Sequence, residues 1–262
     1  MIPRANIVAW QALVRWGEAS QVEQDLVLSR AIVELFSDAG AREQLAFRGG
    51  TALHKLHLAP AARYSEDIDL VQVEAGPAKM VFDLVWSRLD PWLGKPKTTT
   101  KRNGVQLFYA FETEFPPVRT MRVKVEVNTR EHFSELGFVT MPFAVESPWF
   151  SGTAEVTTYS LDEMLGTKLR ALYQRRKGRD VFDLWHAFQR GSVDAATVVR
   201  CFRAYLGRTG LAVSRVEFTT NLDEKAGDKD FRGDIGPLLD PGLTFDHDDA
   251  FALVRERLVA LL

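Results

Sequence analysis

The apolar residues in the first part of the chain change from helical spacing to short runs. One set keeps the three- and four-residue spacing of a helix face: Val22, Leu26, Ile32, Leu35 and Phe36. We predict that this helix starts at a capping-box sequence over residues 20–23 and stops at residues 38–40. The apolar run 45–48 then predicts a short strand, and residues 51–56 begin another helix.

The middle of the chain alternates apolar and polar residues, which predicts strands. Residues 67–73 have strand character, a helix spans about 77–89, and two more strands span 105–115 and 120–128. The Pro116-Pro117 pair between these two strands favours an antiparallel pair. Along the second one, apolar residues alternate with polar ones: Met121, Val123, Val125 and Val127 with Arg122, Lys124, Glu126 and Asn128.

The last part of the chain has helical periodicity. Residues 160–163 are a second capping-box sequence, and five apolar residues trace one helix face: Leu161, Met164, Leu165, Leu169 and Leu172. We expect Gly178 to separate this helix from the next one. Further helices are predicted near residues 195–206 and 248–261, with a connection rich in Gly and Asp near residues 223–242.

These elements predict an α+β fold in two parts, a mixed core over residues 1–158 and a mostly helical lobe over residues 159–262. The composition, with 46% hydrophobic residues, is typical of a globular protein. A single cysteine, Cys201, excludes an internal disulfide, and the five histidines show no metal-ligand spacing. No apolar run approaches the length of a membrane span, and no signal-peptide stretch is present, so we expect a cytoplasmic protein without membrane association.

Charge is nearly balanced overall, at a net −2, but it is unevenly placed along the chain. Residues 168–179 hold six basic residues and no acid, whereas residues 223–249 hold nine acidic residues and three basic ones. The basic run predicts an RNA or phosphate contact through Arg175, Arg176 and Arg179. The alternative is a solvated helix face, and the acidic stretch is interpreted as loop and solvated surface.

Two adjacent glycines after the first predicted strand suggest a site for a nucleotide. Gly49 and Gly50 can take backbone angles closed to other residues and let a phosphate approach the chain. The helix that we expect to begin at Thr51 would add free N–H groups and the positive end of its dipole. We therefore predict that all three residues bind a triphosphate, the alternative being an ordinary turn.

Two aspartates follow the glycines after a helix-length gap. Asp67 and Asp69 occupy positions i and i+2 of a predicted strand, so their carboxylates point to the same side. Two such groups repel each other unless a cation lies between them, and Mg²⁺ favours oxygen ligands. Glu126, on the polar face of a later strand, is a candidate third ligand, with the alternative that it faces solvent or pairs with a lysine.

Lys168 and Asp183 are candidates in the helical part. They are fifteen residues apart, but because Gly178 lies between them we expect proximity across a helical hairpin. Lys168 alternatively extends from an amphipathic helix into solvent, and Asp180 alternatively caps the next helix.

Four segments together resemble the AbiEii/AbiGii nucleotidyltransferase toxins of type IV toxin–antitoxin systems: FRGGTALHK, YSEDIDL, KVEVN and DEMLGTKLRALYQRRKGRDVFDLW. That family is similar to the DNA polymerase β superfamily, so the resemblance implies a polymerase β-like nucleotidyltransferase core. In such cores a glycine turn and a DxD motif, often with a third carboxylate, hold Mg²⁺ and a nucleoside triphosphate. The gap between glycines and DxD is longer than in the simplest version, and a second glycine replaces the usual serine, which suits the toxins better than antibiotic-modifying relatives.

The resemblance implies roles for matching residues. The catalytic set is Asp67, Asp69, Lys168 and Asp183, with Arg179 and Asp180 in the same motif as the last two; the nucleotide-binding set is Gly49, Gly50, Thr51, Ser65 and Lys168; the metal set is Asp67, Asp69 and Glu126. Ser65 is expected to position the site, or alternatively to be a self-modified hydroxyl. Lys168 and the glycine turn would stabilise charge on the leaving pyrophosphate.

The implied activity is Mg²⁺-dependent transfer of a nucleotide from an NTP to an RNA, in close relatives the tRNA 3′ end, which blocks translation and growth. A cognate antitoxin is the implied protein partner. Two alternatives stay open: a nucleotidyltransferase acting on a small molecule of the antibiotic type or on a protein, and a binding module with a vestigial metal site.

Overall fold

The computed structural model describes residues 2–101 and 104–262, which form two compact units. The first consists of Met1–Ser134 and Phe138–Tyr159, and the second of Glu135–Gly137 and Ser160–Leu262. No helix within the described ranges is long and apolar enough to cross a membrane.

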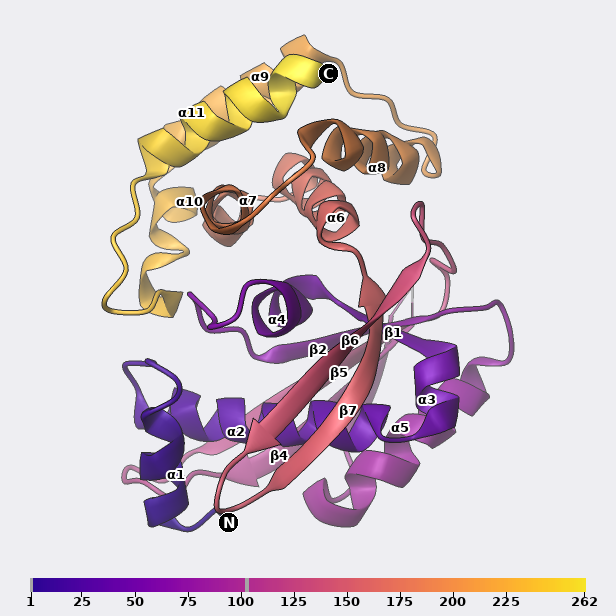
Figure 1. The fold of residues 1–262 in the computed structure, drawn as a ribbon, viewed down its shortest axis with the longest axis vertical. Helices are drawn as coiled ribbons and strands as arrows, with labels where there is room; N and C mark the ends of the chain where they lie inside the picture. Colours follow the sequence, from indigo (N-terminus) through magenta and orange to yellow (C-terminus); the bar gives the residue numbers. More distant parts are fainter. Residues whose placement is uncertain (1, 102–103) are drawn as a thin grey trace. The chain divides into compact units, whose positions relative to one another are not determined.

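The first unit is built on a seven-stranded mixed sheet with the order β3-β4-β5-β2-β1-β7-β6 (Figure 1). The pairs β2/β5 and β1/β7 are parallel and the other neighbours antiparallel. The strands are β1 Leu45–Arg48, β2 Asp67–Gln72, β3 Lys97–Lys101, β4 Gly104–Glu112, β5 Thr120–Asn128, β6 Phe138–Glu146 and β7 Ser151–Tyr159. The α+β class with a mixed sheet is thus confirmed, as is the antiparallel pair on either side of Pro116-Pro117.

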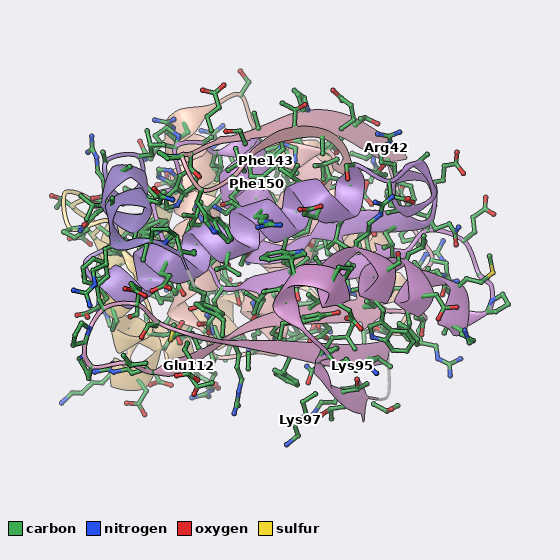
Figure 2. The ribbon with its side chains drawn as sticks, turned by 90° about the horizontal axis from the view of Figure 1, so that it is seen from below. Arg42, Lys95, Lys97, Glu112, Phe143 and Phe150 are labelled. Atoms are coloured by element: carbon green, nitrogen blue, oxygen red, sulfur yellow. The ribbon has the colours of Figure 1, made fainter. Side chains whose placement is uncertain are left out.

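Helices of the first unit cover the sheet and close its core. They are α1 Arg4–Gln11, α2 Ala19–Phe36, α3 Ala39–Gln44, α4 Gly49–Ala52 and α5 Ala78–Leu93, with a π-helical turn over Leu53–His57. Figure 2 shows α2 and α5 side by side in front of the strands, and α2 packs against β5, β6 and β7. Because α2 is covered along most of its length, its apolar side chains are almost fully buried and form the centre of the core.

Two predicted helix ends in this unit are wrong. The capping box at residues 20–23 does not form, because α2 already begins at Ala19, and Glu23 is buried and accepts a hydrogen bond from the Glu114 backbone N–H instead. The helix expected to stop near residue 89 continues through Pro91 to Leu93. A proline in the last turn removes only one backbone donor, so it does not end the helix there.

The second unit is helical. Its helices are α6 Leu161–Gln174, α7 Gly178–Arg190, α8 Ala195–Gly207, α9 Arg215–Ala226, α10 Lys229–Gly233 and α11 His247–Arg257, with 3₁₀ turns at Gly236–Leu238 and Val259–Leu261. The side chain of Ser160 caps α6 by accepting from the Glu163 N–H, which is one half of the predicted capping box. The Glu163 carboxylate accepts from the backbone N–H of Leu136 and from the Tyr205 hydroxyl.

The interpretation of the acidic stretch as loop is wrong for much of its length. Helix α9 begins with a complete capping box formed by Ser214 and Glu217, and Asp228 caps α10. Helices α9 and α11 lie side by side (Figure 1). The many acids in this stretch are therefore capping and surface residues of short helices, which weak apolar periodicity does not reveal.

Candidate active site

The turn after β1 requires glycine at two consecutive positions. Gly49 has φ of 83°, and a Cβ there would overlap the carboxylate of Asp69. A Cβ on Gly50 would overlap the guanidinium of Arg63 and lie 3.2 Å from Ser65 Oγ. The helix begins at Gly49, so the prediction that it starts at Thr51 is corrected by two residues. The absence of side chains on Gly49 and Gly50 thus lets the backbone lie directly against the polar groups behind it.

The DxD pair begins β2 beside this turn. Asp67 and Asp69 alternate with the buried Ile68 and Leu70, so the two aspartates share one side of the strand. Antiparallel pairing puts Arg48, the last residue of β1, opposite Asp69. The glycine turn and the carboxylates, which are separated along the chain, therefore meet at one end of the β1/β2 pair.

Hydroxyl groups connect the turn to β2. Thr51 Oγ1 lies 2.6 Å from the Asp67 carbonyl oxygen and 2.8 Å from Ser65 Oγ. Thr51 is almost fully buried, so these contacts hold the first turn of α4 against the start of β2. Ser65 therefore lies next to the glycine turn, where it is predicted to position the site.

The carboxylate of Asp69 is perturbed. Burial and then the charge of Asp67 raise the pKa of Asp69 from 3.8 to about 6, while Lys124 and Arg48 partly oppose the rise. Arg48 is itself held by Glu131, with Nη1 2.6 Å from Oε2. The ionised form of Asp69 is therefore less favoured than that of an ordinary aspartate, and additional positive charge close to it would stabilise that form.

Lys124 provides positive charge beside these carboxylates. Parallel pairing of β2 with β5 puts Lys124 opposite Asp67 and Glu126 opposite Asp69. The Lys124 ammonium donates to Asp67 Oδ2 at 2.8 Å and lies 3.6 Å from Glu126 Oε2. Burial lowers its pKa, but the hydrogen bond and charge of Asp67 outweigh this and raise the pKa of Lys124 overall. Glu126 also accepts from Gln106 Nε2 at 2.7 Å.

The donor set fits a divalent cation by its chemistry. Asp67 and Asp69 present carboxylate oxygens on one side of β2, and burial and then the charge of Asp67 raise the pKa of Asp69. A divalent cation, which favours oxygen ligands, would stabilise both ionised carboxylates. Within residues 2–101 and 104–262, no group of three or more His, Cys, Asp or Glu side chains is arranged to hold a metal ion. The role of Glu126 as a third ligand therefore stays a prediction.

Two basic residues at this site received no role in the sequence analysis. The sequence predicted only that Lys124 belongs to the polar face of its strand. The two-residue spacing between Lys124 and Glu126 indicates that both side chains lie on the same side of that strand. Arg63 is 2% exposed and lies directly behind Gly50. No periodicity marks Arg63, because its position depends on how the chain returns from the π-helical turn to β2.

In the second unit, Lys168 and Asp183 are in contact across the α6/α7 hairpin. Lys168 Nζ is 2.7 Å from Asp183 Oδ2 and 3.5 Å from Asp180 Oδ1. Lys168 is only 6% exposed, so the alternative that it extends into solvent is wrong. Asp180 does not cap α7; its two carboxylate oxygens accept a bidentate pair of hydrogen bonds, both 2.7 Å, from Arg175. The predicted proximity across the hairpin is thus observed.

The basic run and the acidic stretch of the sequence face each other within this unit. Arg176 pairs with Glu224 and Asp228, at 3.2 and 3.1 Å, and Asp234 accepts from Lys177 and lies 3.6 Å from Arg179 Nε. These partly exposed pairs contribute little stability each. They do mean that Arg175, Arg176 and Arg179, the predicted RNA-binding residues, all have acidic partners, so a phosphate would have to compete for them.

Two solved structures that share this fold are described as nucleotidyltransferases. MenT4, a nucleotidyltransferase toxin of Mycobacterium tuberculosis H37Rv, superposes with a TM-score of 0.63 at 18% identity, over 100% of this chain and 91% of that chain. An inferred nucleotidyltransferase of Helicobacter pylori has a TM-score of 0.51 at 16% identity, over 94% and 99% of the two chains. The H. pylori protein JHP933 has a TM-score of 0.49 at 16% identity, over 93% and 92%. The fold is therefore that of a nucleotidyltransferase.

The family follows from the sequence profile described as nucleotidyl transferase AbiEii toxin, type IV TA system, which matches residues 30–253. The chain belongs to this family of toxin nucleotidyltransferases. The comparison with curated proteins finds no match. The resemblance in the sequence analysis is thus confirmed for family and fold, and the family implies an NTP substrate and an antitoxin.

Proposed function

We propose that this toxin transfers a nucleoside monophosphate from an NTP to an RNA, with the 3′ end of tRNA as the acceptor. The observation that carries the proposal is the packing of the Gly49 turn against Asp69, with Asp67 on the same side of β2. A turn without side chains next to two carboxylates is suited to a triphosphate with its divalent cation. Blocking the acceptor end of tRNA would stop translation and growth.

Each residue of the site has a proposed role that follows from its chemistry. Backbone N–H groups of Gly49, Gly50 and Thr51 would bind phosphate oxygens, and Ser65 would orient the same phosphates. Asp67 and Asp69 would hold Mg²⁺, which supplies charge neutralisation and lowers the pKa of the attacking hydroxyl. The acceptor hydroxyl then attacks the α-phosphorus, and the bond to the bridging oxygen of pyrophosphate breaks.

Support for an RNA acceptor rests on the resemblance to toxins that modify tRNA, more than on the basic run of the second unit. Exposed lysines occur in the first unit as well: Lys95 precedes β3, and Lys97, the first residue of β3, extends from the sheet edge in Figure 2. Such side chains suit contacts with an RNA backbone, which are electrostatic and independent of sequence. Acceptors of the small-molecule or protein type are the alternatives that the assay separates.

The deciding assay uses purified protein, Mg²⁺, each α-labelled NTP in turn and total tRNA, resolved on a denaturing gel. We expect labelled tRNA with the wild-type protein and none with Asp67→Ala. Asp83→Ala is the matched control, because Asp83 is an exposed aspartate of α5 that forms a surface ion pair with Lys79. It should retain full transfer.

Lys168→Met in the same assay tests the predicted role of Lys168 in stabilising charge on the leaving pyrophosphate. Label retained by Asp67→Ala would refute the proposed chemistry, and label on small molecules or protein with none on tRNA would refute the acceptor. In cells, expression should arrest growth with the wild-type protein and not with Asp67→Ala.

A further inference from the structure

A metal ion bound to the Asp67 carboxylate would lie close to the ammonium of Lys124. Its ammonium donates to Asp67 Oδ2 at 2.8 Å and lies 3.6 Å from Glu126 Oε2. The parallel register of β2 and β5 fixes this position, because it puts Lys124 opposite Asp67 and Glu126 opposite Asp69. The contact is therefore a consequence of strand pairing.

The charges of the cluster explain why this contact matters. The Lys124 ammonium contacts the carboxylates of Asp67 and Glu126 and interacts electrostatically with that of Asp69, at a position where 25% of the Lys124 side chain is accessible. A divalent cation and an ammonium repel each other, and both would bind the Asp67 carboxylate, whose Oδ2 is held by Lys124. Metal binding at this site must therefore displace the Lys124 ammonium or work against its charge.

The ammonium group of a lysine can readily be displaced from a carboxylate. Its ammonium is a compact charge with three donors on a flexible four-carbon stem, so it can move to another anion without a change in the backbone. A triphosphate arriving at the neighbouring glycine turn brings both a divalent cation and new anionic oxygens. The new oxygens offer the ammonium a replacement for Asp67.

We propose that Lys124 is an exchangeable counter-cation that makes metal binding depend on the nucleotide. In the nucleotide-free protein its ammonium occupies Asp67 and keeps divalent-cation affinity low. When the triphosphate binds with its cation, the ammonium leaves Asp67 for a phosphate oxygen and the carboxylate becomes a metal ligand. This inference rests on the proposed function, because it takes Asp67 as a ligand of the metal that accompanies the NTP.

The competing role for Lys124 is purely structural, as an ion pair that holds β5 against β2. Removing the positive charge beside Asp67 should strengthen metal binding in either case. The two roles differ in the effect of the nucleotide. A structural lysine predicts that the NTP analogue enhances metal affinity equally in the wild-type protein and in variants without Lys124, whereas an exchangeable counter-cation predicts a smaller enhancement in those variants, provided that the protein remains folded.

The test measures binding of Mn²⁺ by electron paramagnetic resonance, with the full-length protein, with and without a non-hydrolysable NTP analogue. Lys124→Met keeps the length of the side chain and removes its charge, and Lys124→Gln is a second variant that keeps a polar end. Lys97→Met is the matched control, because Lys97 is an exposed lysine at the sheet edge. Thermal unfolding of each variant verifies that it is folded.

We expect Lys124→Met and Lys124→Gln to bind Mn²⁺ without nucleotide on the order of tenfold more tightly than the wild-type protein, as the loss of one charge-assisted contact predicts. The analogue should enhance Mn²⁺ affinity less in these variants than in the wild-type protein, and Lys97→Met should behave as wild type. Unchanged or weaker Mn²⁺ binding by both folded variants, or an equal enhancement by the analogue in these variants and in the wild-type protein, would overturn the inference. If the wild-type protein with the analogue bound no Mn²⁺ through Asp67, as judged with Asp67→Ala, the proposed function itself would fail.

Discussion

Replacing Asp69 by asparagine should stabilise the metal-free protein while removing a group that the proposed activity requires. The pKa of Asp69 is raised to about 6, chiefly by burial and then by the charge of Asp67. The folded state therefore binds a proton at Asp69 more tightly than the unfolded chain does. Between the ordinary pKa of 3.8 and the raised one, the folded protein holds more protons, so its free energy of unfolding falls as pH rises.

The magnitude follows from the shift. About two pKa units at about 1.4 kcal/mol per unit give roughly 3 kcal/mol, the cost at pH 7 of keeping Asp69 ionised in the folded state. Asparagine is a neutral side chain of the same shape and does not incur this cost. The stability difference between Asp69→Asn and the wild-type protein should be small near pH 4 and reach about 2–3 kcal/mol above pH 7.

The assay is equilibrium unfolding in urea with EDTA, at several pH values between 4.5 and 7.5. Tryptophan fluorescence reports on the first unit, because five of the six tryptophans lie there. Asp83→Asn is the control, since Asp83 is exposed and should change stability little at any of these pH values. An Asp69→Asn protein that is no more stable than the wild type at pH 7.5, or whose advantage does not grow with pH, would refute the assigned electrostatic environment.

Two further changes test other parts of the structure. Gly49→Ala should destabilise the first unit by roughly 2 kcal/mol or more and abolish transfer, because alanine at this positive φ is strained and its Cβ overlaps Asp69. Gly94→Ala separates backbone strain from steric overlap, since φ is 76° there but no described atom lies within 4 Å of the added Cβ. Equal losses of stability in thermal unfolding for both variants would contradict the overlap with Asp69. Burial lowers the pKa of Lys225 from 10.5 to about 8. Between these two pH values the unfolded chain holds more protons than the folded protein. The free energy of unfolding of the second unit should therefore rise with pH across this window, by up to about 3 kcal/mol. Lys225→Met should flatten that rise in a pH series of thermal unfolding, and an unchanged slope would show that Lys225 is not its source.

The sequence by itself determined the features that depend on local spacing. Alternation along residues 120–128 predicted a strand with one apolar face, and β5 has that strand with Val123, Val125 and Val127 buried. Four segments, among them those with the glycine pair and the DxD motif, identified the family, because their order along the chain is preserved whatever the packing. Helical spacing in the last part likewise predicted α6 and α8 close to their observed ends.

Only the tertiary structure decided which charges meet. The sequence analysis treated the basic run as a surface for RNA and the acidic stretch as loop, but helix packing in the second unit pairs Arg176 with Glu224 and Asp228. Similarly, the contact of Lys124 with Asp67 arises from the register between two parallel strands. Parallel strands are joined by long crossover connections, so neither strand's own pattern encodes its register with the other. Periodicity reports which face of an element is buried, whereas the partner of a charged side chain depends on segments far away in the chain.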